Sequence, residues 1–216
     1  INPDDKNALE EALRIKDENP DTTVTVVSMG PPQADVAMRE ALAMGADEAI
    51  LISGREFGGS DTWATSYIIA TAIKKIPDYD IIFCGRQAID GDTAQVGPQI
   101  AEQLNIPQIT YVQKLDIEGD KVIVQRQLED GYTVVEAKMP VLLTAIKELN
   151  TPRYMTPKGI FEAYNKTVQV WGFNDVPVDA EKIGLKGSPT NVNRTFSPEA
   201  KGKGIMLEGA DKETVK

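Results

Sequence analysis

Apolar residues follow a helical period at the start of the chain and form a strand-like run directly after it. Behind the segment Asn2-Pro3-Asp4-Asp5, they recur at helical spacing at Ala8, Leu9, Ala12, Leu13 and Ile15. The two acids stand where the positive end of a helix dipole favours them. This pattern predicts a helix that stops at the Asn-Pro-Asp of residues 19–21, followed by a buried strand over residues 22–27.

The same alternation repeats twice more. Helical patterns cover residues 34–44, with Gly45 directly after the helix, and run from a Ser60-Asp61 cap to residue 76. Short apolar strands are predicted at residues 49–52 and 80–84. Repeated strand–helix units with short apolar strands are typical of a parallel sheet with helices on both faces. The fold class is therefore expected to be α/β.

After residue 104 the pattern changes. Residues 109–115, 122–128 and 132–137 predict antiparallel strands, because turn-forming residues separate them, and residues 141–145 predict one more strand. From Thr151 onward Pro and Gly become frequent and periodicity is lost. We therefore expect an α/β domain over residues 1–150 with an antiparallel extension, and a C-terminal arm over residues 151–216 that wraps a partner.

The amino-acid composition limits which kinds of catalytic and metal site the chain can form. The 216 residues include 23 Lys and Arg against 33 Asp and Glu, a net charge of −10, with one cysteine and no histidine. Histidine-dependent triads, histidine-bound zinc and an intrachain disulfide are thereby excluded. The acidic balance argues against nucleic acid and anionic membrane surfaces as partners, and no apolar run is long enough to span a membrane. A soluble protein of a reducing compartment, the cytoplasm, is expected.

The most informative stretch is the loop over residues 85–98, which leaves a predicted strand and enters a predicted helix. In open α/β sheets, ligands bind beyond the carboxyl ends of the strands, and a helix N-terminus there suits a phosphate. The loop is no Walker A motif, and no GxGxxG fingerprint occurs in the chain. Small residues would let the backbone approach a ligand: Gly91, Thr93, Ala94 and Gly97. The alternative is a solvent-facing turn with capping Asp and Thr.

Two aspartates of this loop suggest another kind of site. Asp90 and Asp92 could serve Mg²⁺ binding or acid–base chemistry, but turn and cap formation explains them more simply. Cys84 ends a buried strand and is expected to be an inert core residue. We therefore expect no catalytic residue and no metal site, and the residues alone predict only a nucleotide-binding α/β domain with an arm.

Four segments together resemble the beta, or small, subunit of electron-transfer flavoproteins, from residue 1 to about residue 186. They are residues 2–13 (NPDDKNALEEAL), 28–31 with 41–47 (SMGP and ALAMGAD), 88–97 (AIDGDTAQVG), and 140–144 with 150–154 (PVLLT and NTPRY). In that family a strand and a hairpin precede the position of Ile1. The resemblance therefore implies that an N-terminal part, and a C-terminal helix, lie outside this chain.

The resemblance implies a Rossmann-like domain that binds an adenine nucleotide, in a heterodimer with an FAD-carrying alpha subunit. Family contacts carried over position by position fall at the first helix, after the first strand, and along the loop and the helix that follows it. The residues are Asn2, Pro3, Asp4, Asp5, Met29, Gly30, Gly85, Arg86, Asp92, Thr93, Ala94, Gln95, Val96, Gly97, Pro98 and Gln99.

The nucleotide is either AMP, as in simple electron carriers, or a second FAD, as in electron-bifurcating members of anaerobic bacteria. Small or apolar residues at Thr93, Ala94 and Val96 favour FAD. The resemblance then implies NADH as electron donor, with ferredoxin or flavodoxin and an acyl-CoA dehydrogenase as acceptors. The family's dehydrogenase-docking loop follows Pro152-Arg153-Tyr154, where this chain departs with Pro157-Lys158-Gly159. A stress-type nucleotide sensor and an ATP-using enzyme are the alternatives from other classes.

Overall fold

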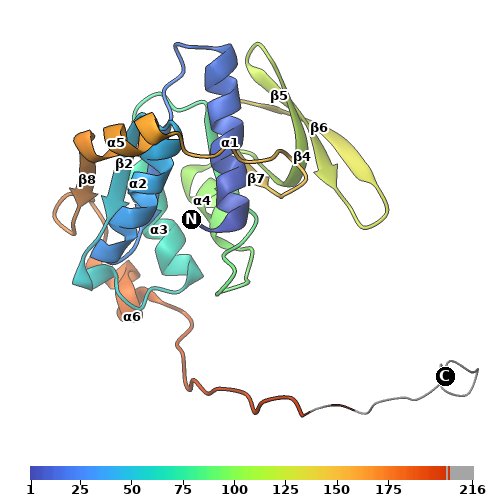
Figure 1. The fold of residues 1–216 in the computed structure, drawn as a ribbon. Helices are drawn as coiled ribbons and strands as arrows, with labels where there is room; N and C mark the ends of the chain where they lie inside the picture. Colours follow the sequence, from blue (N-terminus) through green and yellow to red (C-terminus); the bar gives the residue numbers. More distant parts are fainter. Residues whose placement is uncertain (203, 205–216) are drawn as a thin grey trace, which may run out of the picture.

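The computed structural model, which describes residues 1–202 and 204, confirms the α/β class and divides the strands between two sheets (Figure 1). The first sheet is parallel and has the order β1-β2-β8. Its strands are β1 (Thr25–Met29), β2 (Glu48–Ile52) and β8 (Val168–Trp171).

The second sheet is mixed and has the order β3-β7-β4-β5-β6. Strands β3, β7 and β4 run parallel, and β4, β5 and β6 form the antiparallel extension that the sequence predicts. The strands are β3 (Ile81–Gly85), β4 (Gln108–Glu118), β5 (Lys121–Gln127), β6 (Tyr132–Lys138) and β7 (Val141–Ala145). Within the described residues no ladder joins β1 to β3, so each is the edge of its sheet.

Helices cover both sheets, and α1 belongs to both cores. Leu9 and Leu13 of α1 pack with α2 and β2, while Ala8 packs against β7 and β4. None of the described helices has the length and apolarity that a bilayer span requires. The helices are α1 (Pro3–Glu18), α2 (Asp35–Met44), α3 (Thr62–Ile73), α4 (Val96–Leu104), α5 (Pro157–Asn165) and α6 (Gly184–Gly187), with 3₁₀ turns at Pro32–Ala34, Arg55–Phe57 and Ala180–Lys182.

Local chemistry sets the ends of these helices. Asp61 caps α3 as predicted, because its carboxylate accepts the N–H of Ala64 at 3.0 Å. Gly45 ends α2 with φ 133°, a conformation that favours glycine. The helix predicted to reach residue 76 ends instead at Ile73 of α3, and Lys74 follows as its cap.

The prediction of an extended arm over residues 151–216 is wrong for the first part of this range. Residues 157–171 form α5 and β8, and β8 pairs with β2 from Ala49↔Val168 to Ile52↔Trp171. Helix α5 lies so close to α2 that a Cβ on Gly159 would stand 2.4 Å from the carbonyl oxygen of Ala43. Residues 189–202 are extended and lead away from the domain (Figure 1), and their wrapping of a partner stays a prediction.

Candidate functional site

Strand β3 ends at Gly85, directly against the N-terminus of α1. The N–H of Gly85 donates to Oδ1 of Asp5 at 2.6 Å. A Cβ on Gly85 would stand 2.7 Å from the backbone nitrogen of Asp5, so only glycine allows this approach. Burial raises the pKa of Asp5, although the N–H of Gly85 and the amide of Asn2 both stabilise its carboxylate.

Asn2 joins the start of α1 to the loop that follows β3. Its Nδ2 donates to Oδ2 of Asp5 at 2.9 Å and to the carbonyl of Gln87 at 3.0 Å. Its Oδ1 accepts the N–H of Ile89 at 3.3 Å. Arg86 Nε lies 3.4 Å from Oδ2 of Asp4. Five of the predicted site residues thus come together here: Asn2, Asp4, Asp5, Gly85 and Arg86.

Within the loop the acids make local contacts. Oδ1 of Asp92 accepts from the side chain of Gln87, and Oδ1 of Asp90 accepts the N–H of Gly91 at 2.8 Å. Asp92 and Ala94 both adopt left-handed backbone, each with φ 52°. These contacts agree with turn formation, and the described residues hold no group of three acidic or cysteine side chains that could bind a metal.

The N-terminus of α4 has no side-chain cap, while the first turn packs tightly on the sheet. Gln95 precedes the helix without a side-chain cap, and its Oε1 accepts instead from Thr62 of α3 at 2.9 Å. A Cβ on Gly97 would stand 2.7 Å from Sγ of Cys84 and 3.2 Å from Cγ2 of Thr144. The helix therefore begins directly on the ends of β3 and β7, and within the described part of the chain no side chain bonds to its first N–H groups.

Among the described residues, two buried side-chain atoms in this region lack a hydrogen bond: Oε1 of Gln99, and Nε of Arg86, which has only the 3.4 Å ion pair with Asp4. A buried polar atom without a partner costs about 1–3 kcal/mol. One is a donor and the other an acceptor, and an adenine nucleotide offers groups of both kinds. Together with the open helix start, this donor and acceptor set fits a nucleotide.

The structure does not join all predicted site residues. Met29 ends β1 in the other sheet and packs in the apolar cluster of Ile52 and Tyr67. The N–H of Gly30 donates to the carbonyl of Ile52 at 3.0 Å. Among the hydrogen bonds and ion pairs of residues 1–202, none links Met29 or Gly30 to the loop, so their role as ligand contacts stays a prediction.

Sequence reasoning missed two side chains at this site. Gln87 and Thr62 hold the loop through Asp92 and Gln95. Neither carries a signal in the sequence, because Gln87 reads as an ordinary loop residue and Thr62 as part of a helix start.

The family model for the electron transfer flavoprotein domain matches residues 1–176. The chain belongs to the electron transfer flavoprotein family. This confirms the resemblance drawn from the four sequence segments.

Curated relatives agree with the beta-subunit class. The electron transfer flavoprotein subunit beta of Thermoanaerobacterium thermosaccharolyticum is 63% identical over all of this chain and 82% of that protein. The caffeyl-CoA reductase-Etf complex subunit CarD of Acetobacterium woodii is 58% identical over 97% of this chain and 80% of its own length. The acryloyl-CoA reductase electron transfer subunit gamma of Anaerotignum propionicum is 55% identical over all of this chain and 83% of its own length.

Proposed function

We propose that this beta subunit binds FAD at the loop and helix start of residues 85–99 and takes part in electron bifurcation. Bound there, FAD would supply the chemistry that accepts a hydride, and so two electrons, from NADH, with NAD⁺ released. The two electrons would be divided between ferredoxin or flavodoxin and, through the FAD of the alpha subunit, an acyl-CoA dehydrogenase.

The observation that carries this proposal is the start of α4. Its first turn packs on the ends of β3 and β7 through Gly97, and no side chain of the residues that the structure describes caps it. The helix dipole and free N–H groups favour a phosphate at such a position. The small Ala94 favours a ligand that contains a pyrophosphate, which AMP lacks.

The protein's own residues position a ligand there and do no acid–base work. Bound FAD supplies both two-electron and one-electron chemistry, while the protein sets its orientation and its electrostatic surroundings. Asn2 and Asp5 fix the loop, and Arg86 brings a positive charge beside it. Burial raises the pKa of Cys84 to about 12, so this thiol stays protonated and serves as packing.

Two relatives support the choice of acceptor. The names of CarD and of the acryloyl-CoA reductase subunit place those proteins with reductases of CoA thioesters. In this chain the segment after Pro152 presents large side chains to solvent, with Tyr154 95%, Phe161 76% and Tyr164 73% exposed. We assign this surface, Tyr154 to Tyr164, to docking of an acyl-CoA dehydrogenase.

Cofactor content tests the proposal directly. The chain is co-expressed with the alpha subunit, the cofactors are released by acid, and FAD and AMP are counted for each heterodimer. Two FAD and no AMP are expected. One FAD with one AMP would reduce this subunit to a non-bifurcating carrier whose nucleotide is structural, and absence of flavin and AMP alike would refute the nucleotide site itself.

A charge-matched pair of variants tests the location of the site. Thr93→Glu puts a carboxylate beside the predicted phosphate position, whereas Thr23→Glu makes the same change at an exposed residue before β1. Repulsion near a surface is worth about 1–2 kcal/mol, so Thr93→Glu should weaken FAD binding by about tenfold. Titration of FAD into cofactor-stripped heterodimer measures this, and equal affinities of the two variants would place the phosphates elsewhere.

A further inference from the structure

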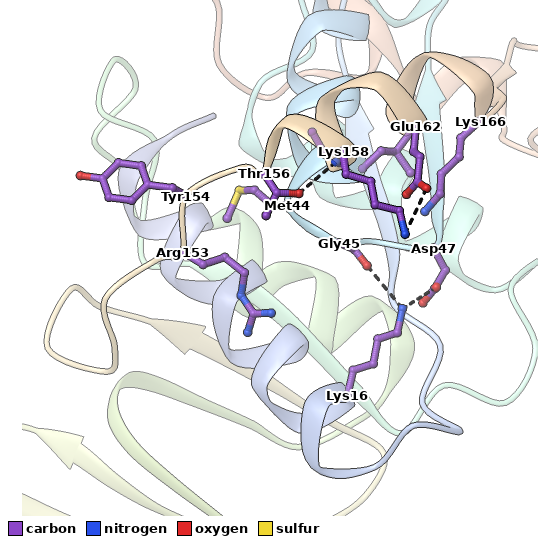
Figure 2. A pocket seen from close by; sticks show the side chains of 13 residues that line it. Lys16, Met44, Gly45, Asp47, Arg153, Tyr154, Thr156, Lys158, Glu162 and Lys166 are labelled. Atoms are coloured by element: carbon purple, nitrogen blue, oxygen red, sulfur yellow. Dashed lines mark hydrogen bonds and ion pairs between the residues drawn. The ribbon is translucent and has the colours of Figure 1, made fainter.

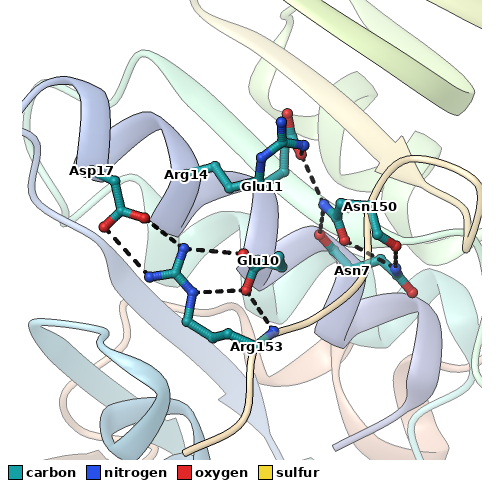
Figure 3. A network of polar contacts seen from close by, with 7 residues as sticks. All are labelled: Asn7, Glu10, Glu11, Arg14, Asp17, Asn150 and Arg153. Carbon is teal, nitrogen blue, oxygen red and sulfur yellow. Dashed lines mark hydrogen bonds and ion pairs between the residues drawn. The ribbon is translucent and has the colours of Figure 1, made fainter.

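Arg153 is clamped by two acids of α1, directly before the docking segment (Figure 3). Its Nε and Nη2 donate to the two carboxylate oxygens of Glu10 at 2.9 and 3.0 Å. Its Nη2 and Nη1 reach Asp17 at 2.7 and 3.4 Å. Its backbone N–H donates to Glu10 as well, at 2.9 Å. Glu10 therefore binds both the side chain and the backbone N–H of Arg153, and so ties the start of the docking segment to α1.

Glu10 makes this clamp costly to break. Its side chain is only 6% exposed, and a buried carboxylate is stable only when it is paired. The hydrogen bonds from Arg153 lower the pKa of Asp17, while those to Glu10 and Asp17 raise the pKa of Arg153 above its ordinary range. Asp17 and Arg153 therefore stay charged across the physiological range. The planar guanidinium binds each carboxylate through paired hydrogen bonds, a bidentate geometry that an ammonium does not form.

Between Arg153 and Thr156, which caps α5, no further hydrogen bond or ion pair joins this segment to the rest of the described residues. A pocket of about 350 Å³ lies on one side, lined by Arg153, Tyr154 and Thr156 together with Lys16 and residues of α2 and α5 (Figure 2). A second hollow of about 180 Å³ adjoins Pro152 to Met155. Tyr154 points away from the pocket in Figure 2 and is 95% exposed. Packing alone thus leaves the position of Tyr154 loosely defined.

The same helix carries the nucleotide loop at its other end. Asn2 and Asp5 at the start of α1 bind the loop after β3, and Glu10 and Asp17 bind Arg153 further along. Since a helix is a stiff element, the distance between the nucleotide site and Tyr154 is set through α1.

We infer that Arg153 is a positioning residue for electron delivery: its clamp on Glu10 and Asp17 fixes Tyr154 and the start of the docking segment relative to the nucleotide site. The inference rests on the proposed function, because it assumes that an acyl-CoA dehydrogenase binds there. Pre-organisation of a docking segment lowers the entropy lost on binding, so loss of the clamp weakens docking without changing the chemistry.

Three variants of the co-expressed heterodimer test this inference. Arg153→Gln removes the clamp, and Arg153→Lys keeps a positive charge near Glu10 but cannot form the fork, which covers the case in which the first variant folds poorly. Arg14→Gln is the matched control, since Arg14 pairs with Glu11 at 3.2 Å on the same helix, its one hydrogen bond or ion pair among the described residues.

Two readouts separate positioning from folding. With a short-chain acyl-CoA dehydrogenase of the same organism as acceptor, Arg153→Gln should raise KM about tenfold and Arg153→Lys about threefold, with kcat, FAD content and flavin reduction by NADH unchanged. Without any partner, chymotrypsin should cleave after Tyr154 about tenfold faster in Arg153→Gln, because the segment is no longer held. Arg14→Gln should match the wild type in both.

The outcomes are distinguishable. The inference is overturned if the Arg153 variants match Arg14→Gln in KM and in cleavage, or if FAD content falls together with docking, which would mean a general loss of the fold. If cleavage rises while KM stays unchanged, the clamp does not serve docking and the inference is equally overturned. If the wild-type heterodimer reduces no dehydrogenase at all, the proposed function fails at this step, while the cleavage rates still decide whether Arg153 holds the segment.

Discussion

Gly97 lies in the first turn of α4 and Gly91 lies six residues earlier in the same loop, yet the two glycines have different surroundings. A Cβ on Gly97 would press on Cys84 and Thr144, whereas a Cβ on Gly91 would meet no atom of the described residues within 4 Å. Gly97 therefore lets α4 pack closely on the sheet, because a larger residue would not fit. Gly91 instead borders open space above the loop.

This difference predicts opposite effects of one substitution. Gly97→Ala should destabilise the domain by about 1–3 kcal/mol, as overpacking of a core does. Gly91→Ala, the matched control, should be neutral or stabilising by up to about 1 kcal/mol, because it restricts the unfolded chain. Thermal unfolding of the heterodimer measures both, and the double variant Gly97→Ala, Cys84→Ala should recover part of the loss. Equal melting points for the two single variants would contradict this account of Gly97.

The raised pKa of Asp5 predicts that the stability of the folded protein depends on pH. Burial raises its pKa above the ordinary 3.8, so the folded protein binds a proton there that the unfolded chain has already released. The stability contributed by protonated Asp5 is present at low pH and is lost as the pH rises through the raised pKa. Asp5→Asn should therefore flatten the fall in melting temperature that the wild type shows as the pH rises above the ordinary pKa of aspartate.

The control for Asp5 is Asp21→Asn, which changes an exposed aspartate in the turn after α1. It should leave the pH profile as in the wild type. A profile of Asp5→Asn that coincides with the wild type would show that the titration of this carboxyl does not affect folding.

At the scale of elements, local pattern predicted most of the first 145 residues. The strand at Val141–Ala145 agrees with the structure at both ends, and the other helices and strands differ by a few residues, because periodicity and caps are local signals. The division into two sheets could not be predicted in this way, since it depends on which distant strands pair.

The elements after residue 151 were missed for a related reason. Strand β8 has only four residues, and Val168 gains its burial from β2, more than a hundred residues earlier. Helix α5 is short and carries Gly159 in its first turn, which lowers its intrinsic helix propensity but allows contact with Ala43. At the candidate site, the loop and its N-terminal partners were predicted through resemblance, whereas the hydrogen bonds of Gln87 and Thr62 required the structure.

At the scale of the molecule, the chain from residue 167 divides into an integral part and an extended part. Residues 168–188 add a strand to the first sheet and bury Val168, Val176 and Ile183. Among residues 1–202, Thr190 is the last that hydrogen-bonds to the domain: its N–H and Oγ1 donate to Asp61 at 2.9 and 2.7 Å. Beyond it, Val192 and Phe196 are exposed, at 82% and 76%.

Two truncations test this division. A chain that ends at Lys166 loses the three buried side chains, each worth about 1.5–3 kcal/mol, against a total stability of about 5–15 kcal/mol for a domain. It should not yield soluble heterodimer, because β2 also becomes an exposed edge. A chain that ends at Thr190 keeps the contacts to Asp61 and should retain its FAD content and melt within a few degrees of the full chain, while binding the alpha subunit less tightly. Soluble yield, thermal unfolding and subunit dissociation on dilution measure these effects. Similar behaviour of the two truncated chains would show that β8 is no more integral to the domain than the arm is.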